Sequence, residues 1–258
     1  MKKIAPNLDL VEAPKFLRAW IWIQIWIHVI CGVLTLSFIF PFLDRRNKDQ
    51  KIQEWSKRLL QIFNIDLVVL GTHWLEDTPH LIASNHISWL DIHVINAFKP
   101  IRFVAKSEVE GWPIFGWMAK QLGTVFIRRD STRHARQVVG QMAEVLKIES
   151  ICIFPEGTST VGDSVLAFKS NLFESAIAAK VPVYPLAIQY LSRATGTRSE
   201  SSAFIGDMGL LESMSRVIKN RSLVVQIRFL PAFSDGLLSH IDRKQLANYS
   251  QESISKSL

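Results

Sequence analysis

The sequence predicts an α/β protein with a mixed, mostly parallel sheet flanked by helices and an N-terminal helical segment attached to a membrane. From about residue 65 onward, short apolar runs alternate with helical patterns, as in layered α/β proteins. Residues 19–42 form an almost unbroken apolar stretch. The chain has 258 residues, of which 48% are hydrophobic, so it can bury a large core without disulfides or metals. We therefore expect membrane-anchoring helices over residues 1–64 and an α/β domain over residues 65–258.

The apolar stretch at residues 19–42 is long enough to cross a bilayer as a helix, and Pro41 is expected to end or kink it. It is too long for a secretory signal, and no small-residue cleavage site follows it. A single span usually has positive charge on one side, whereas basic residues flank this stretch on both sides. The pattern favours a monotopic hairpin or interfacial helix pair on one anionic leaflet. A true span and a buried helix of a soluble protein are the alternatives. The flanking basic residues are Lys2, Lys3, Lys15, Arg18, Arg45, Arg46, Lys48, Lys51, Lys57 and Arg58.

Residues 47–63 predict an amphipathic helix, because their apolar residues recur at a spacing that places them on one face. This helix is either a second membrane-surface helix or a helix packed on the α/β domain. The apolar residues of that face are Ile52, Trp55, Leu59, Leu60 and Phe63.

Within the domain, short apolar runs predict strands and longer periodic segments predict helices. In sheets of this kind, functional residues gather in the loops at strand ends. The predicted strands are 66–71, 80–85, 101–106, 123–128, 150–155, 181–190, 202–206 and 222–230. The predicted helices are 89–98, 112–121, 131–148, 169–179, 208–219 and 239–256.

The composition indicates an anionic partner and a reducing compartment. The net charge is +7, and the apolar N-terminus favours membrane lipids over nucleic acid, for which the sequence has no zinc-finger or RNA-binding signature. A basic balance without a specific partner is the alternative. The eight tryptophans suit a membrane interface. The only two cysteines, Cys31 and Cys152, argue against a disulfide framework.

The segment NHISWLD at residues 85–91 lies at a predicted strand-to-helix turn and contains His86 and Asp91. On one continuous helix, side chains at this spacing would lie about 140° apart. The two can meet if His86 lies in the turn before the helix. A neutral imidazole would then take the proton of an attacking hydroxyl, while the carboxylate fixes its tautomer. In the alternative, Ser88 and Asp91 form a helix capping box and His86 is an ordinary turn residue.

The segment FPEGT at residues 154–158 directly follows the predicted strand 150–155. Pro155 ends the pairing of that strand, and Gly157 allows a tight turn with positive φ. Glu156 is therefore expected to project at a strand end that a substrate can approach. The alternative role of Glu156 is to stabilise the turn or form a salt bridge.

Taken together, four motifs resemble those of the glycerolipid acyltransferases, the group that contains the 1-acylglycerol-3-phosphate acyltransferases. NHISWLD resembles their Asn-His-x-x-x-x-Asp block, and FPEGT resembles their Phe-Pro-Glu-Gly-Thr block. GTVFIRR at 123–129 resembles their Gly-x-x-Phe-Ile-x-Arg block, and VPVYP at 181–185 resembles their Val-Pro-Ile-x-Pro strand. The motifs occur in the family order over residues 85–185.

The resemblance implies a role for each matching residue. It implies that His86 is the general base and Asp91 its partner, with no covalent acyl-enzyme. It implies that Arg129 binds an anionic group such as a phosphate through its planar guanidinium. The residues implied to bind the acceptor head group are Glu156, Gly157 and Thr158.

One departure from the family pattern concerns the acceptor. Many lysophosphatidate acyltransferases have Arg after Glu-Gly-Thr, whereas this chain has Ser159. FPEGTST followed by FKSNLFE is more similar to members that act on other lysolipids, including lyso-ornithine lipid. Arg128 is a further candidate anion ligand. Lys169 is a candidate substrate contact because a cation near a predicted helix N-terminus is unfavourable, and solvent exposure is its alternative.

The expected function is transfer of a fatty acyl chain from acyl-CoA or acyl-carrier protein to the free hydroxyl of a lysolipid. The family favours lysophosphatidate as acceptor, and lyso-ornithine lipid or another lysophospholipid is the alternative. Neither a cofactor nor a metal is expected, because the histidines form no ligand set with suitable partners. A non-catalytic membrane lipid-binding protein and a thioesterase or lipase are alternatives of other classes. We expect the protein at the inner (plasma) membrane with its active domain on the cytoplasmic side.

Overall fold

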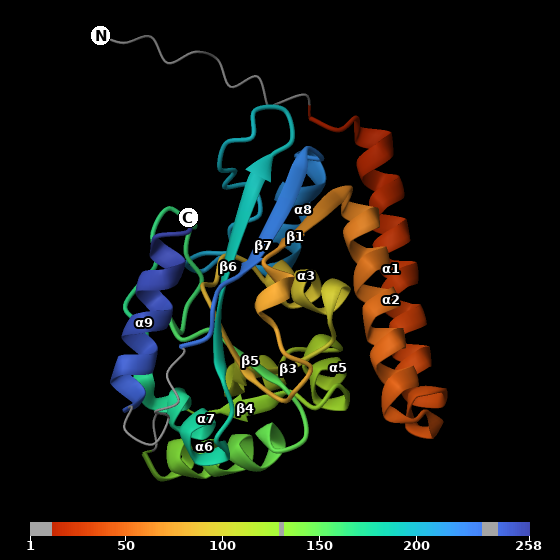
Figure 1. Cartoon of the computed structure of the whole chain (residues 1–258). Coiled ribbons are helices and arrows are strands. Elements are labelled where there is room, and N and C mark those ends of the chain that lie inside the picture. Colours follow the sequence, from red (N-terminus) through yellow and green to blue (C-terminus); the bar gives the residue numbers. More distant parts are fainter. Residues whose placement is uncertain (1–11, 129–131, 234–241) are drawn as a thin grey trace, which may run out of the picture.

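A seven-stranded sheet with helices on both faces forms the body of the protein, and its first two helices lie side by side along one face (Figure 1). This computed structural model describes residues 12–128, 132–233 and 242–258. The strand order is β1-β7-β6-β2-β5-β3-β4, and all neighbours are parallel except β6 and β7. The mixed, mostly parallel sheet predicted from the sequence is thus confirmed. The strands are β1 Ile65–Leu70, β2 Leu81–Ser84, β3 Arg102–Lys106, β4 Val125–Ile127, β5 Ile151–Ile153, β6 Val183–Ser192 and β7 Leu223–Phe229.

The helices around the sheet follow the predicted order, with short additions. One predicted helix, 169–179, divides into a 3-10 turn and a helix, and α4 was not predicted. Two buried apolar clusters lie on opposite faces of the sheet, one beneath α1, α2, α3 and α8 and the other beneath α6, α7 and α9. The elements are α3 Leu90–Phe98, α4 Ser107–Glu110, α5 Phe115–Gln121, α6 Thr132–Leu146, η3 Ser170–Phe173, α7 Glu174–Ala179, α8 Leu210–Lys219 and α9 Arg243–Ser255.

The predicted strand at residues 202–206 is wrong, because the structure has a loop there. Its backbone makes hydrogen bonds with two turns instead of with a strand. The Phe204 N–H donates to the Ile87 carbonyl at 2.9 Å, and the Ser159 hydroxyl donates to the Phe204 carbonyl. The short apolar run that predicted a strand thus belongs to a loop that covers another loop.

The N-terminal apolar stretch forms helix α1, Lys15–Phe38, followed by a 3-10 turn, Phe40–Phe42, that contains Pro41. Helix α1 is long and apolar enough to cross a membrane, by length and composition only. Helix α2, Arg45–Phe63, packs on α3 and β1, which decides between its two predicted placements. Gly32 lets α1 approach α2 closely, since a Cβ there would lie 2.7 Å from the indole Nε1 of Trp55.

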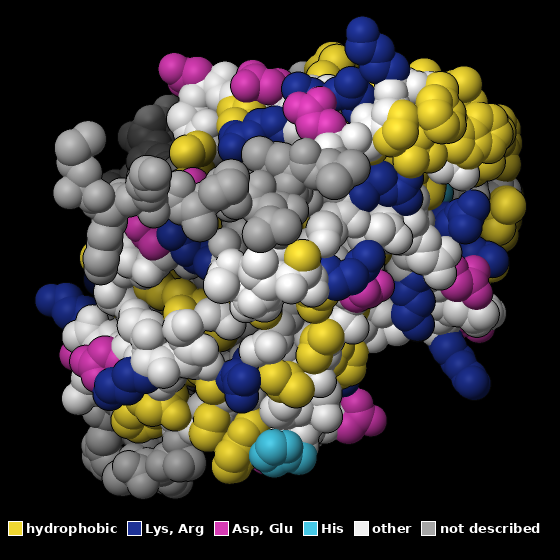
Figure 2. Space-filling model, turned by 90° about the horizontal axis from the view of Figure 1, so that it is seen from above, with side chains coloured by type: hydrophobic (Ala, Val, Ile, Leu, Met, Phe, Trp, Pro, Cys, Tyr) yellow, Lys and Arg dark blue, Asp and Glu magenta, His cyan; other side chains and the backbone are white. Residues whose placement is uncertain are grey.

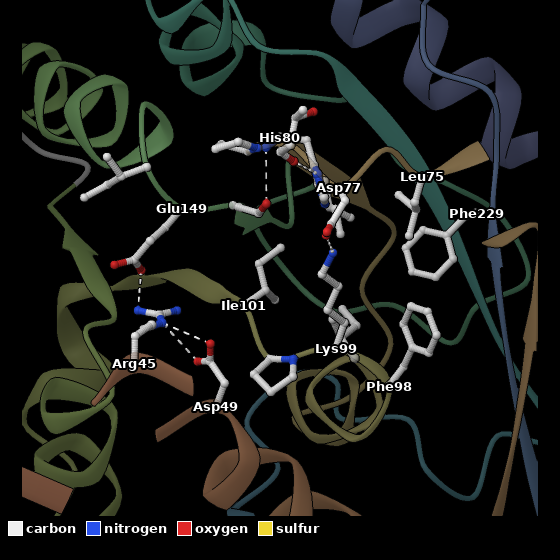
Figure 3. A pocket seen from close by; sticks show the side chains of 17 residues that line it. Arg45, Asp49, Leu75, Asp77, His80, Phe98, Lys99, Ile101, Glu149 and Phe229 are labelled. Atoms are coloured by element: carbon white, nitrogen blue, oxygen red, sulfur yellow. Dashed lines mark hydrogen bonds and ion pairs between the residues drawn. The ribbon is translucent and has the colours of Figure 1, made fainter. Parts of the chain in front are cut away.

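An ionic cluster joins the start of α2 to the sheet at the amino ends of β3 and β5. Glu149 accepts a hydrogen bond from Arg45 (Figure 3). It also accepts from Arg102, whose Nη2 lies 3.0 Å from Oε1. Burial opposes ionisation of Glu149, but the hydrogen bond and charge of Arg102 outweigh it, so the pKa of Glu149 is lowered. Arg45 and Glu149 of this cluster line a cavity of about 250 Å³, and Lys99 and His80 also form part of its wall. This cavity lies at the strand ends opposite those that carry the motifs.

Candidate active site

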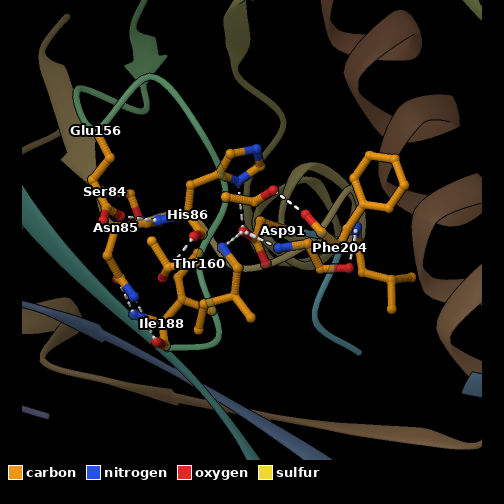
Figure 4. A network of polar contacts seen from close by, with 12 residues as sticks. Ser84, Asn85, His86, Asp91, Glu156, Thr160, Ile188 and Phe204 are labelled. Carbon is orange, nitrogen blue, oxygen red and sulfur yellow. Dashed lines mark hydrogen bonds and ion pairs between the residues drawn. The ribbon is translucent and has the colours of Figure 1, made fainter. Parts of the chain in front are cut away.

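His86 and Asp91 meet in the turn that joins β2 to α3, as the spacing argument requires. The Nδ1 atom of His86 lies 2.8 Å from Oδ2 of Asp91 (Figure 4). Asp91 lies in the first turn of α3 and is fully buried, whereas the His86 side chain is 21% exposed. The imidazole also stacks on Phe154, with ring centroids 4.1 Å apart. The strand end therefore presents a partly exposed imidazole backed by a buried carboxylate.

Four donors surround the buried Asp91 carboxylate. Its Oδ2 accepts from His86 Nδ1 and from the backbone N–H groups of Ile87 at 2.8 Å and Ser88 at 3.0 Å. Its Oδ1 accepts from the Tyr190 hydroxyl at 2.8 Å. Two backbone N–H groups and a hydroxyl donate to this side chain, which suits a group that only accepts. A carboxylate accepts only, which assigns the imidazole proton to Nδ1 and leaves Nε2 as the basic nitrogen.

The contacts of Asp91 combine the catalytic and the capping interpretations of this turn. The Leu90 N–H donates to the Ser88 hydroxyl at 3.3 Å, and the Ser88 N–H donates to the Asp91 carboxylate. Those two contacts resemble the predicted capping box, although α3 begins one residue later, after Trp89. One carboxylate therefore both stabilises the helix start and orients His86.

Asn85 fixes the amino end of the turn to strand β6. Its side chain accepts from the Ile188 N–H at 2.8 Å and donates to the Ile188 carbonyl at 3.0 Å. The amide group thus continues the parallel ladder that pairs Ser84 with Leu186 in the backbone. Because Asn85 is fully buried, the position of the next residue, His86, is set by the sheet.

Glu156 fixes the same turn from the β5 side. It is 3% exposed, and its Oε1 accepts from the His86 N–H at 2.7 Å. Its Oε2 accepts from the Leu166 N–H at 2.9 Å. Burial raises the pKa of Glu156, against the hydrogen bonds from Leu166 and His86, which lower it. The role of Glu156 in binding a head group stays a prediction, whereas its hydrogen bonds with His86 and Leu166 hold the backbone of two loops.

The segment after Glu156 closes over the His86 turn. Gly157 has φ +75°, as its motif predicts, and the Thr160 N–H donates to the His86 carbonyl at 2.9 Å. Ser159 donates to Phe204, so the loop that follows β6 covers this turn. The Phe204 contacts with Ser159 and Ile87 place the loop between β6 and α8 against the turn that carries His86.

The other predicted binding residues lie farther out. Thr158 is exposed, and the backbone N–H of the exposed Lys169 donates to Pro155 at 3.0 Å, which places it beside the same strand end. Arg128 is exposed directly after β4, which lies three strands from β2, or about 14 Å. Arg129 lies outside the described residues. The structure thus brings together His86, Asp91 and Glu156 and leaves Arg128 and Lys169 at the rim.

Tyr190 is the functional residue that the sequence analysis missed. It lies on β6 and is 1% exposed, and burial raises the pKa of its hydroxyl far above the ordinary value, so it remains a donor to Asp91. Cys152 is also fully buried, and burial raises the pKa of its thiol. A buried thiol with a raised pKa is a poor nucleophile, because the thiolate is the reactive form. Among the described residues, no three His, Cys, Asp or Glu side chains gather as a metal site.

A large apolar cavity lies beside this turn, between α1, α2, α3, β3 and α5. Its volume is about 340 Å³, and Trp89 of the catalytic turn forms part of its wall. Phe103, another wall residue, stacks on Phe154, which in turn stacks on His86. The Phe154 ring therefore lies between the wall residue Phe103 and the imidazole.

Comparisons with known proteins agree with the motifs. A family model described as Acyltransferase matches residues 66–189. A lyso-ornithine lipid O-acyltransferase of Pseudomonas aeruginosa is 38% identical over 202 residues, covering 78% of this chain and 75% of that protein. A 1-acyl-sn-glycerol-3-phosphate acyltransferase of Neisseria meningitidis serogroup B is 35% identical over 209 residues, covering 81% and 80%. The crystal structure of the 1-acyl-sn-glycerophosphate (LPA) acyltransferase PlsC from Thermotoga maritima shares the fold, with a TM-score of 0.64 and 22% identity over 94% of this chain and 93% of that one.

Replacing Tyr190 with Phe tests whether this hydroxyl positions Asp91. The variant leaves Oδ1 of a buried carboxylate without its donor, at a cost of about 1–3 kcal/mol. We expect kcat for acyl transfer to fall about 10- to 100-fold while KM for both substrates stays the same. Tyr184→Phe is the matched control, since Tyr184 is 2% exposed and its hydroxyl accepts from the Glu76 N–H. Equal effects of both substitutions on kcat would contradict the role.

Replacing Glu156 with Gln separates a positioning role from head-group binding. A carboxamide has one acceptor oxygen, so its NH₂ group would face either the His86 N–H or the Leu166 N–H. We expect kcat to fall at least about tenfold with an unchanged KM for the acceptor. Glu252→Gln is the control, because Glu252 is exposed on α9 and forms a surface ion pair with Lys256. A rise in acceptor KM at constant kcat would assign Glu156 to the head group instead.

Proposed function

The chain belongs to the Acyltransferase family, and from this premise we propose that it moves a fatty acyl chain from a thioester to the free hydroxyl of a lysolipid. The relatives and the fold support a lysophospholipid acyltransferase, with lysophosphatidate as the family acceptor. The observation that carries the proposal is the 2.8 Å contact between His86 Nδ1 and the fully buried Asp91. A histidine so oriented has the geometry of a general base.

The proposed reaction needs only one proton carrier. Nε2 of His86 takes the proton of the lysolipid hydroxyl as its oxygen attacks the thioester carbonyl carbon. The tetrahedral intermediate then collapses, the carbon–sulfur bond breaks, and the thiolate takes the proton from the imidazolium. Asp91 stabilises the imidazolium between these steps, because its negative charge lies against Nδ1–H.

The described residues around His86 limit the choice of acceptor head group only weakly. Ser159 stands where many family members have Arg, and its hydroxyl already donates to Phe204. The phosphate of lysophosphatidate would therefore depend on Arg128 and Lys169, which lie at the rim, and on Arg129, the arginine of the family motif. The similarity to the Pseudomonas aeruginosa lyso-ornithine lipid O-acyltransferase supports the second acceptor, lyso-ornithine lipid.

The apolar cavity beside Trp89 supports an acyl chain as the transferred group. A pocket lined mainly by hydrophobic side chains suits a hydrocarbon chain, whose burial gives about 0.8 kcal/mol per CH₂. We place the thioester carrier, CoA or acyl-carrier protein, outside this cavity. The positive net charge suits either anionic carrier.

Membrane attachment through α1 is the second part of the proposal. The face of α1 that does not contact α2 exposes large apolar side chains, and these gather at one side of the molecule with Lys and Arg nearby (Figure 2). The opposite face packs into the protein through Ile21, Ile25 and Val29. A helix buried on one side suits monotopic attachment to an anionic leaflet better than a span. The exposed residues are Phe16, Trp20, Ile23, Trp26, Ile27, Ile30, Leu34 and Phe38.

A lysolipid panel assayed with His86→Ala tests the enzymatic function. Loss of the general base is expected to lower acyl transfer by about 10²- to 10⁴-fold for every accepted lysolipid. His73→Ala is the control because His73 is exposed on a separate 3-10 turn. The panel contains lysophosphatidate and lyso-ornithine lipid, and the preferred acceptor identifies the head group. Transfer that persists in His86→Ala would refute the mechanism, and its absence in the native protein would favour a lipid-binding protein.

The double substitution Ile27→Glu and Ile30→Glu tests the attachment surface. Each side chain is 55% exposed, and burying an Ile gives about 1.5–3 kcal/mol. We expect binding to anionic phospholipid vesicles to weaken about 100-fold or more, with an unchanged melting temperature. Ile148→Glu is the control, since Ile148 is 75% exposed and lies after α6. Equal weakening by the control would move the attachment away from α1.

A further inference from the structure

The aromatic ring of Phe154 stacks against the imidazole of His86. The two ring centroids lie 4.1 Å apart, and the ring planes are inclined by 20°. The Asp91 carboxylate contacts a different part of the imidazole, its Nδ1 atom, at 2.8 Å. One face of the imidazole is thus covered by an aromatic ring, while its Nδ1 edge lies against a carboxylate.

The sheet and a second aromatic ring hold Phe154 in this position. Phe154 directly follows β5, which pairs with both β2 and β3, and its carbonyl accepts from the Gly157 N–H at 3.0 Å. Its side chain is partly buried and packs on the apolar cluster beneath α1, α2 and α3. The Phe103 ring lies nearly parallel to that of Phe154, with an angle of 13° between the ring planes. The stack on His86 is therefore built into the core and is not a chance surface contact.

An aromatic ring in this position distinguishes the two charge states of the imidazole. The face of an aromatic ring carries partial negative charge, so it attracts a cation that lies within about 6 Å of the ring centroid. In the proposed reaction, His86 is neutral before it acts and becomes an imidazolium when it takes the proton of the hydroxyl. The contact is therefore stronger in the transition state than in the ground state, which is the condition for a contact to accelerate a reaction.

The small exposure of His86 increases the effect that such a contact can have. The His86 side chain is 21% exposed, so little water is available to solvate the imidazolium. The Asp91 carboxylate neutralises the charge at Nδ1 only, and the ring face is left to its aromatic neighbour. Contacts between a cation and an aromatic face strengthen as water is removed.

We propose that Phe154 is a positioning residue for acyl transfer, which orients the imidazole of His86 and stabilises its protonated form through a cation–π contact. This inference rests on the proposed function, in which His86 is the general base. If Phe154 served packing alone, the rate would depend on the shape of its side chain. A cation–π contact makes the rate depend on the negative charge of the ring face as well.

Fluorinated phenylalanines at position 154 of the full-length protein separate charge from shape, because fluorine withdraws electrons from the ring face and adds little volume. Phe154 is replaced by mono-, di- and trifluorophenylalanine, and kcat and KM are measured with one lysolipid and one acyl thioester. We expect log kcat to fall linearly with the number of fluorines, to a total loss of about 5- to 30-fold, with unchanged KM for both substrates. This loss corresponds to about 1–2 kcal/mol.

The same series at Phe173 is the matched control. Phe173 is fully buried in η3, in the apolar cluster on the opposite face of the sheet. Fluorination there is expected to leave kcat unchanged. A constant kcat across the series at Phe154, or an equal loss at Phe173, would overturn the inference.

Two natural substitutions add a test of the same contact. Phe154→Tyr keeps an aromatic face and is expected to keep kcat within about twofold, whereas Phe154→Leu removes that face and is expected to lower kcat at least about fivefold. Equal rates in the two folded variants would contradict the cation–π contact, and the fluorine series decides if Phe154→Leu does not fold. Absence of transfer by the native protein would instead refute the proposed function.

Discussion

The buried carboxylate of Asp91 is the constraint on which the catalytic turn depends. A charge without solvent must be surrounded by donors, and three of its four come from the turn itself, through His86, Ile87 and Ser88. The turn therefore adopts the conformation that saturates this carboxylate. Orientation of His86 is a consequence of that requirement, because its Nδ1–H is one of the donors. Tyr190 contributes the fourth donor from the sheet.

The sheet makes this local arrangement rigid by holding the turn from both neighbouring strands. Asn85 extends the ladder toward β6, and Glu156 reaches across from the end of β5 to the His86 N–H. Both side chains are buried, so neither can exchange its backbone partner for water. Two loops at the carboxyl ends of the parallel strands β2 and β5 thus become one unit. This gives Glu156 a structural reason to be a carboxylate that is independent of any substrate contact.

The sequence predicts the pair His86 and Asp91 because both lie in one seven-residue segment whose geometry follows from a strand-turn-helix pattern. It does not reveal Tyr190, which is 99 residues from Asp91 and looks like any buried residue of an apolar strand. The prediction of a strand at residues 202–206 is wrong for a related reason: a short apolar run indicates buried side chains but not whether a neighbouring strand is available. Strand and helix order depends on local pattern and was predicted well, whereas contacts between distant loops were not.

The N-terminal helices connect the site to its lipid substrates because α1 is apolar on two faces for different reasons. Its inner face, with Ile25 and Val29, forms a wall of the cavity beside Trp89. Its outer face exposes Ile27 and Ile30. If the outer face contacts lipid, then the same helix separates the membrane from the cavity by one helix diameter, about 10 Å. A lysolipid and an acyl chain would then reach His86 without crossing water. The apolar residues that resembled a membrane span in the sequence thus form two faces of one helix, one lining the cavity and one exposed on the surface.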